Sequence, residues 1–205
     1  MGDSTSRETV AQVLADLQDF VAEAFSTHAW ARFGLLHEHD LLMQMPAGEP
    51  GKPETATITI HVGPDSEPFP PYSTWTVIDA RALTDPNGGP VHLRLGHQFV
   101  VFLLAGWEHE YRPRLAAAHG CDAGDIKVPV IGDLRLMRND IIHHHAIATS
   151  SNSGRCQVLR HWVTIGDAID LGPEQLAELW AIFPWSDLKT PPSSDGADPS
   201  ADLGA

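Results

Sequence analysis

The chain has 205 residues, 42% of them hydrophobic, which is enough for one substantial core. Its net charge of −14 argues against a general nucleic-acid binder, because such proteins carry a basic surface. Two cysteines are too few for a disulfide framework and predict a reduced, cytoplasmic protein. No apolar run approaches the roughly 20 residues of a membrane helix, so we expect no membrane contact.

The first predicted element is an amphipathic helix over residues 6–28. Thr5 and Glu8 have the spacing of a capping box, and the apolar residues that follow recur at helical intervals. These are Val10, Val13, Leu14, Leu17, Val21 and Phe25. Residues 28–45 continue either as a second helix or as an irregular apolar segment, and residues 46–53 form a Pro- and Gly-rich break.

Residues 54–95 change to a two-residue alternation, which is the pattern of a strand. It is strict in residues 57–62 and recurs in 74–77 and 91–95. A Pro-rich connection and the turn at residues 85–89 separate these runs. We expect a small β-hairpin or three-stranded flap, inserted between the first helix and the later ones.

A second long helix is predicted from His97 to His119, and its first half is apolar nearly all round. Pro113 should kink it or start a new segment, and Gly120 is a suitable end. Within it, Glu108 and Arg112 are four residues apart and can form an ion pair.

The next helix is predicted from Pro129 or Asp133 to Ala148. Its core-facing stripe consists of Leu134, Met137, Ile141 and, more loosely, Ile142. All reactive side chains are expected off this stripe. They are Arg135, Arg138, Asn139, Asp140, His143, His144 and His145. Arg135, Asn139 and His143 are successive i, i+4 neighbours and therefore lie along one face.

The remainder is predicted to close the domain at about residue 185. Residues 150–154 are small or polar and are expected to be mobile, while residues 158–165 are predicted to be a strand or extended. A last helix should begin at Pro173 and end at Pro184. Its inward side chains would be Leu176, Leu179, Trp180 and Phe183. Residues 186–205 have the composition of a disordered acidic tail.

The sequence Arg138-Asn139-Asp140-Ile141-Ile142-His143 resembles the R-x4-6-H signature of the HEPN superfamily, with a polar residue directly after the arginine. The resemblance covers roughly residues 96–184. It implies a mostly α-helical, HEPN-like bundle with the β segment as an insertion, usually dimerised so that two motifs face each other. Many members are metal-independent ribonucleases of toxin–antitoxin, phage-defence and RNA-processing systems.

RNA can be cut without a metal when a base activates the 2′-hydroxyl and a cation matches the charge that develops on phosphorus. His143 suits the first role and Arg138 the second, while Asn139 could hold a phosphate oxygen or fix an imidazole tautomer. Arg112, Arg135 and His144 are candidate substrate-binding residues. We expect no cofactor.

Several alternatives stay open at this stage. His144 and His145 also satisfy the family spacing, and we prefer His143 because it stacks with Asn139. A purely structural alternative pairs Arg138 with Asp140 or Glu108 and leaves the histidines in solvent. The three histidines fan over about 200° of helix and cannot all bind one ion, so no metal site is predicted.

The function predicted from the sequence is a metal-independent endoribonuclease, acting as a homodimer on RNA, with an antitoxin or sensor protein as a possible partner. Residues 96–185 carry 10 acids and 7 bases, so any contact with RNA should be local rather than driven by a long-range field. The rival prediction is a non-catalytic HEPN-like module that binds RNA or a nucleotide, or scaffolds a toxin–antitoxin or defence complex. A third is an ordinary helical interaction protein.

Overall fold

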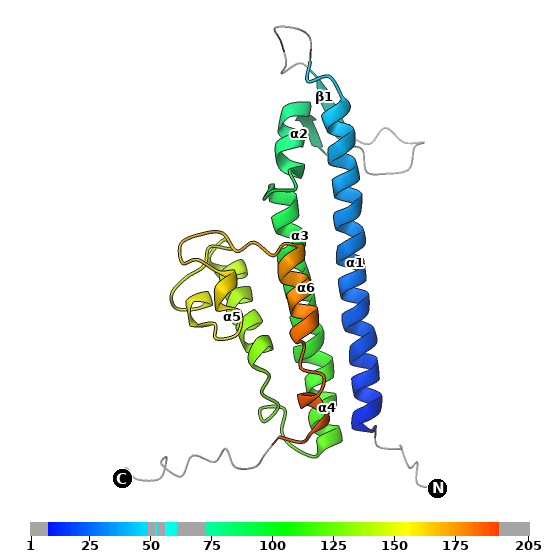
Figure 1. Cartoon of the computed structure of the whole chain (residues 1–205), viewed down its shortest axis with the longest axis vertical. Helices are drawn as coiled ribbons and strands as arrows, with labels where there is room; N and C mark the ends of the chain where they lie inside the picture. The colour runs from blue at the N-terminus through cyan, green and yellow to red at the C-terminus, as the bar shows by residue number, and fades with distance from the viewer. Residues whose placement is uncertain (1–7, 49–51, 53–55, 61–72, 193–205) are drawn as a thin grey trace.

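The computed structural model describes residues 8–48, 52, 56–60 and 73–192 (Figure 1). It is mostly α-helical with one small antiparallel hairpin in the described residues, which confirms the predicted mostly-α class with a small β-hairpin. The main elements are α1 (Val10–Gln44), β1 (Thr57–Ile60), β2 (Ser73–Thr76), α2 (Val77–Thr84), α3 (Pro90–Gly106), the π-helical turn η2 (Trp107–Tyr111), α4 (Arg112–His119), α5 (Pro129–His143) and α6 (Pro173–Ile182). Short 3-10 turns follow α5 and α6: η3 (Ser153–Arg155), η4 (Arg160–Trp162) and η5 (Asp187–Lys189).

Helix α1 is a single helix of 35 residues, so residues 28–45 continue the first helix instead of forming a second one. Its capping box is made by Thr9 and Gln12, not by the predicted pair that begins at Thr5. Thr5 lies outside the described residues, and Glu8 lies just before the helix. Of the predicted apolar stripe, Val13, Leu14, Leu17 and Val21 are buried, and Val10 and Phe25 are partly buried.

Of the two forms predicted for the β insertion, the small hairpin is confirmed and the three-stranded flap is wrong. Strands β1 and β2 pair antiparallel, with Ile58 opposite Trp75. Residues 61–62 of the first predicted strand lie outside the described residues. The predicted third strand, residues 91–95, is wrong because it is the start of α3, which opens with Pro90 in its first turn. The short alternation there belongs to a longer helical pattern of buried residues at positions 92, 96, 99, 100 and 103.

Helices α3 and α4 form one rod that is interrupted by the π-helical turn η2 (Figure 1). Pro113 lacks the N–H that the carbonyl of His109 would accept, and its ring would crowd that carbonyl, so the wider turn lies just before it. Gly106 lets the ring of Phe20 approach, since a Cβ there would meet the ring at 2.3 Å. Gly120 ends α4 with φ 77°, as predicted.

The core lies between the first half of α1, the α3–α4 rod, α5 and α6. Helix α6 begins at Pro173 as predicted, and it directs Leu176 and Leu179 inward, followed by buried Phe183. Trp180 was expected in this set but is 46% exposed, and its ring makes a T-shaped contact with that of Phe25.

The segment between α5 and α6 was predicted to start with a mobile stretch, and this is wrong. Residues 153–155 form η3, and Ser153 is fully buried. A strand was also predicted at residues 158–165, and this is wrong because residues 160–162 form the 3-10 turn η4, which buries Trp162. Beyond α6, Leu188 in η5 is buried, so the predicted disorder cannot begin at 186. Residues 193–205 lie outside the described part.

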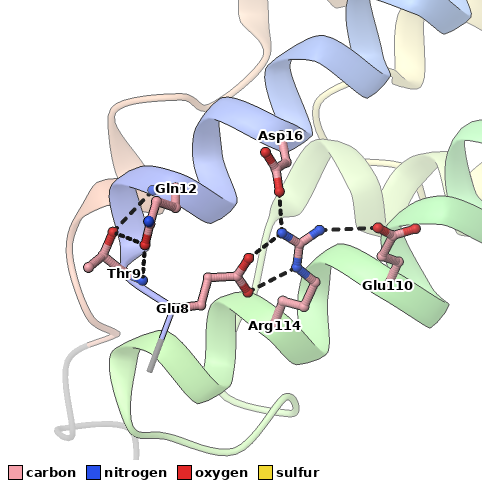
Figure 2. Close-up of polar contacts among 6 residues, drawn as sticks. All are labelled: Glu8, Thr9, Gln12, Asp16, Glu110 and Arg114. Atoms are coloured by element: carbon pink, nitrogen blue, oxygen red, sulfur yellow. Dashed lines mark hydrogen bonds and ion pairs between the residues drawn. The ribbon is translucent and has the colours of Figure 1, made fainter. Parts of the chain in front are cut away.

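An arginine on α4 ties the rod to the start of α1. The Arg114 guanidinium contacts the carboxylates of Glu8, just before α1, of Asp16 on α1 and of Glu110 on η2 (Figure 2). It also lies over the ring of Tyr111, at 5.4 Å from the centroid. The hydrogen bond from Arg114 and its charge hold the pKa of Glu8 below its usual range. We refer to these four charged residues as the Arg114 cluster.

Candidate functional site

Helix α5 carries the motif, but it ends at His143 and not at Ala148 as predicted. The carbonyl of Asp140 accepts hydrogen bonds from the N–H groups of His144 and Ala146, which closes the helix. His145 and Ala146 then adopt φ values of 54° and 61°, a left-handed turn usually made by glycine.

The core stripe of α5 is confirmed only in part. Leu134 and Met137 are fully buried and Ile141 packs partly against the core, whereas Ile142 is 53% exposed. The expectation that every reactive residue lies off the stripe is wrong. Asp133 lies four residues before Met137 and Asp140 lies three residues after it, so both share its side of the helix, and both are buried.

Asp140 is the acceptor around which the chain after α5 folds. Its carboxylate accepts hydrogen bonds from the backbone N–H and hydroxyl of both Thr149 and Ser153 and from the amide of Asn152, at 2.6–3.0 Å. Burial alone would raise the pKa of Asp140, but these hydrogen bonds outweigh it and hold the pKa well below its usual range. The carboxylate is therefore charged, without an ion pair in the described structure.

Asp133 is likewise a buried acceptor, for the backbone of residues 157–159. Its carboxylate accepts the backbone N–H groups of Gln157, Val158 and Leu159 at 2.6–3.0 Å. Both aspartates of α5 are thus turned inward and satisfied by N–H and hydroxyl donors, so they do not neutralise the cations of the helix.

The two arginines of α5 share one carboxylate, that of Glu108 on η2. Arg135 Nε donates to Glu108 Oε1 at 2.6 Å, and Arg138 Nη1 donates to Oε2 at 2.8 Å. Burial alone would raise the pKa of Glu108, but the hydrogen bonds from the two arginines bring it below its usual value. The predicted Glu108–Arg112 pair is not formed. Arg112 instead donates from Nε to the carbonyl of Ile126.

The structure brings some of the predicted site residues together and leaves others apart. Asn139 Oδ1 is 3.4 Å from Arg138 Nη2, beside the Glu108 pair. His143 is exposed at the last helical position, and His144 and His145 are exposed beyond it. Among the described residues, His143 has no hydrogen bond to Arg138 or Asn139. These features are those of the purely structural alternative, in which Arg138 pairs with Glu108 and the histidines face solvent.

Beside this face lies an open cleft of about 490 Å³. It is bordered by η2 and the start of α4, by the segment before α5 with the first turns of α5, and by the end of η3. Four cations line it: Arg112, Lys127, Arg135 and Arg155. Arg112 and Arg135 were predicted substrate-binding residues, but Lys127 and Arg155 were not. No local pattern points to them, because Lys127 lies just before α5 and Arg155 ends η3, and the two meet only in the folded chain.

The described residues contain no group of three or more His, Cys, Asp or Glu side chains that could hold a metal ion. Cys121 and Cys156 are free thiols, and burial raises the pKa of Cys156 to about 12. None of the described helices has the length and apolarity needed to cross a membrane.

Comparisons of the chain with protein-family models, with curated proteins and with solved structures find no match. The resemblance to the HEPN superfamily therefore rests on the motif residues alone.

Proposed function

We propose that the chain is a metal-independent endoribonuclease of the HEPN type, active in the cytoplasm in a toxin–antitoxin or phage-defence setting. The observation that carries the proposal is the arrangement of Arg138, Asn139 and His143 on the last two turns of α5. Glu108 holds the Arg138 guanidinium beside Asn139, while His143 stays open to solvent on the same helix.

In the proposed reaction, His143 takes the proton of a ribose 2′-hydroxyl, whose oxygen attacks the adjacent phosphorus. Arg138 donates hydrogen bonds to the non-bridging oxygens as their charge increases, and Asn139 holds one of them. The bond from phosphorus to the 5′ oxygen breaks, and that oxygen takes a proton from a second imidazole or from water. The products are a 2′,3′-cyclic phosphate and a 5′-hydroxyl, and no redox step is involved.

The proposal includes a two-fold dimer in which the motifs of two copies face each other and one His143 acts as base while the other acts as acid. What supports it is the exposed apolar surface around the end of α5. Ile142, Ile147 and Ile165 are 53%, 39% and 50% exposed. An antitoxin or sensor protein could cover the same surface when the enzyme is inactive.

The test is cleavage of a fluorescent single-stranded RNA in the presence of EDTA, with the ends of the products identified. His143→Ala should reduce the rate by about 10²–10⁴, the usual contribution of a positioned acid or base. Arg138→Ala should lose at least as much, and Arg138→Lys should restore little because an ammonium lacks the planar fork. His145→Ala should have a milder effect, since His145 lies outside the helix.

Arg94→Ala is the matched control, because Arg94 is an exposed arginine on α3 that does not line the cleft. Loss of cleavage with EDTA would contradict the metal-independent reaction. Full activity of His143→Ala together with an inactive His144→Ala would move the base to His144. Analytical ultracentrifugation that finds an active monomer would remove the dimer from the proposal.

The second candidate function is a non-catalytic module that binds RNA or a nucleotide, or scaffolds a complex. The Arg135–Glu108–Arg138 arrangement favours it, because the two guanidinium groups are already engaged by a carboxylate. If Arg138→Ala lowers the melting temperature and the purified wild-type chain cuts no RNA as a dimer, the second candidate replaces the first.

A further inference from the structure

We infer that the open cleft beside α5 is a binding site for a nucleotide, with its phosphates against Arg112, Lys127 and Arg155 and its nucleoside on the apolar wall. This does not depend on the proposed RNA cleavage, and it gives the nucleotide binding of the second candidate function a site away from Arg138, Asn139 and His143. The volume of about 490 Å³ lies within the range of roughly 300–1,000 Å³ that is usual for small-molecule sites.

The charge of the cleft is the first argument. Four cations line it against a single acid, Asp133, in a chain whose net charge is −14. The carboxylate of Asp133 is buried and engaged by three backbone N–H groups, so it does not offset the cations. The local charge is therefore opposite to that of the protein as a whole, and an anion is the ligand that it favours.

The second argument is that three of these cations have no acidic partner within the described residues. Arg135 forms an ion pair with Glu108. Arg112 donates a hydrogen bond from its Nε to the carbonyl of Ile126, and its other donors have no acidic partner in the described residues. Lys127 and Arg155 are exposed and make no ion pair in the described part of the chain. Their donors remain available for a ligand, and arginine in particular fits phosphate in a bidentate manner.

The wall of the cleft argues for a nucleotide over a bare anion. The lining includes Ile126, Val128, Ile131 and Leu136, and these apolar side chains suit the flat apolar face of a base. The N-terminus of α5 lies at the same place. Pro129 offers no N–H there, but no side chain caps the N–H groups that follow it in the first turn, and a phosphate oxygen is the kind of acceptor that such a helix start favours.

Gly132 adds an independent observation. A glycine inside a helix destabilises it relative to alanine, and a Cβ at this position would meet nothing within 4 Å. Gly132 lines the open cleft, and no other part of the described protein occupies the position that its side chain would take. A ligand that approaches the backbone of α5 would use it.

The test measures binding of four probes by calorimetry at low and moderate salt: AMP, ATP, inorganic triphosphate and a 2′-O-methyl tetranucleotide that cannot be cut. At least one nucleotide probe should bind at least tenfold more tightly than inorganic triphosphate. Tight binding of ATP or AMP alone identifies a free nucleotide as the ligand, and tight binding of the tetranucleotide alone identifies a unit of an RNA strand. No binding, or equal binding of all four, overturns the inference.

Two helical glycines provide matched variants. Gly132→Glu puts a carboxylate into the cleft and should weaken the best probe by at least tenfold. Gly34→Glu makes the same change on α1, where a side chain would also meet open space, and should leave binding unchanged. Gly132→Ala should raise the melting temperature and retain binding, which shows that α5 tolerates a side chain there.

Lys127→Gln and Arg155→Gln should each weaken the best probe about three- to tenfold, as expected for the loss of one charge-assisted hydrogen bond near the surface. Neither should change RNA cleavage if the cleft is a separate nucleotide site. Binding that survives all of these substitutions lies elsewhere on the protein, and the inference is then wrong. His143→Ala should bind as the wild type does, so failure of the proposed cleavage reaction and failure of this site remain distinguishable.

Discussion

The Arg114 cluster and the outer face of α5 contain the same residue types in opposite proportions. In the first, one arginine meets three carboxylates, from Glu8, Asp16 and Glu110 (Figure 2). In the second, one carboxylate, that of Glu108, meets two arginines. An arginine surrounded by acids holds two helices together, whereas cations that outnumber their acids keep donors for a ligand.

The difference arises from where the acids point and not from how many there are. Helix α5 contains two aspartates and two arginines, so its formal charge is balanced. Asp133 and Asp140 face the core and are satisfied by N–H and hydroxyl donors, while both arginines face outward. A count of charges along the sequence therefore misses the cationic surface that the fold creates.

The largest expected effect on stability is that of Asp140→Asn. The substitution removes a buried charge that accepts five hydrogen bonds, and its new amide N–H₂ would face donors at Ser153 and Thr149. We expect a loss of about 3–5 kcal/mol in the free energy of unfolding, measured in urea. Asp170→Asn, at an exposed position, should change it by less than about 0.5 kcal/mol.

The pH dependence of the free energy of unfolding is a second measurement of the contribution of Asp140. The pKa of Asp140 is lowered in the folded chain from its ordinary 3.8, so its contribution is fully present above that pH and is lost as the pH falls below it. Acid unfolding of Asp140→Asn should then be less steep than that of the wild type below about pH 4. A substitution that costs less than about 1 kcal/mol would show that the loop after α5 does not depend on this carboxylate.

Glu108→Gln should have the next largest effect. It removes the charge of the carboxylate that Arg135 and Arg138 share, which we expect to cost about 1–3 kcal/mol in urea unfolding. Because the pKa of Glu108 is below its ordinary 4.5, this contribution is present above that pH and declines as the pH falls below it.

Glu110→Gln is the control for this prediction, since Glu110 lies on the same π-helical turn and, among the described residues, pairs with Arg114 alone, in a more exposed ion pair. It should cost no more than about 0.5 kcal/mol. Glu108→Gln should also tighten nucleotide binding in the cleft a few-fold at low salt, because Arg135 loses its partner. If the two glutamine variants are equally stable, the contrast between the two regions is wrong.

The sequence predicted the helical class, the helix that begins at Pro173, the end at Gly120, and the buried positions Leu134 and Met137. These depend on local rules of periodicity and capping, which act within a few residues. It failed at residues 91–95, where a run of five alternating residues is too short to distinguish a strand from a helix. The longer pattern, which begins at Pro90, decides for the helix.

Of the candidate site, only the outer face of α5 could be predicted from the sequence. Asp140 could have been recognised as inward-facing from its spacing to Met137 and Asp133. Its donors lie 9 to 13 residues downstream, in a segment whose small polar composition suggested mobility. The cleft was beyond prediction, because Lys127 and Arg155 come near Arg112 and Arg135 only through tertiary packing.

The smallest expected effects come from the same substitution at two neighbouring positions of α4. Arg114→Gln should lower the free energy of unfolding by about 0.5–1 kcal/mol, since its partners are largely exposed and solvent screens the pairs. It should leave nucleotide binding unchanged, because Arg114 does not line the cleft.

Arg112→Gln should have the opposite pattern. It loses one hydrogen bond to Ile126, so stability changes little, but the affinity of the cleft for the nucleotide falls several-fold. Urea unfolding and calorimetry on the two variants measure both quantities. If both variants lose stability and both keep their nucleotide affinity, Arg112 is as structural as Arg114, and the proportion of acids to bases does not distinguish the two regions.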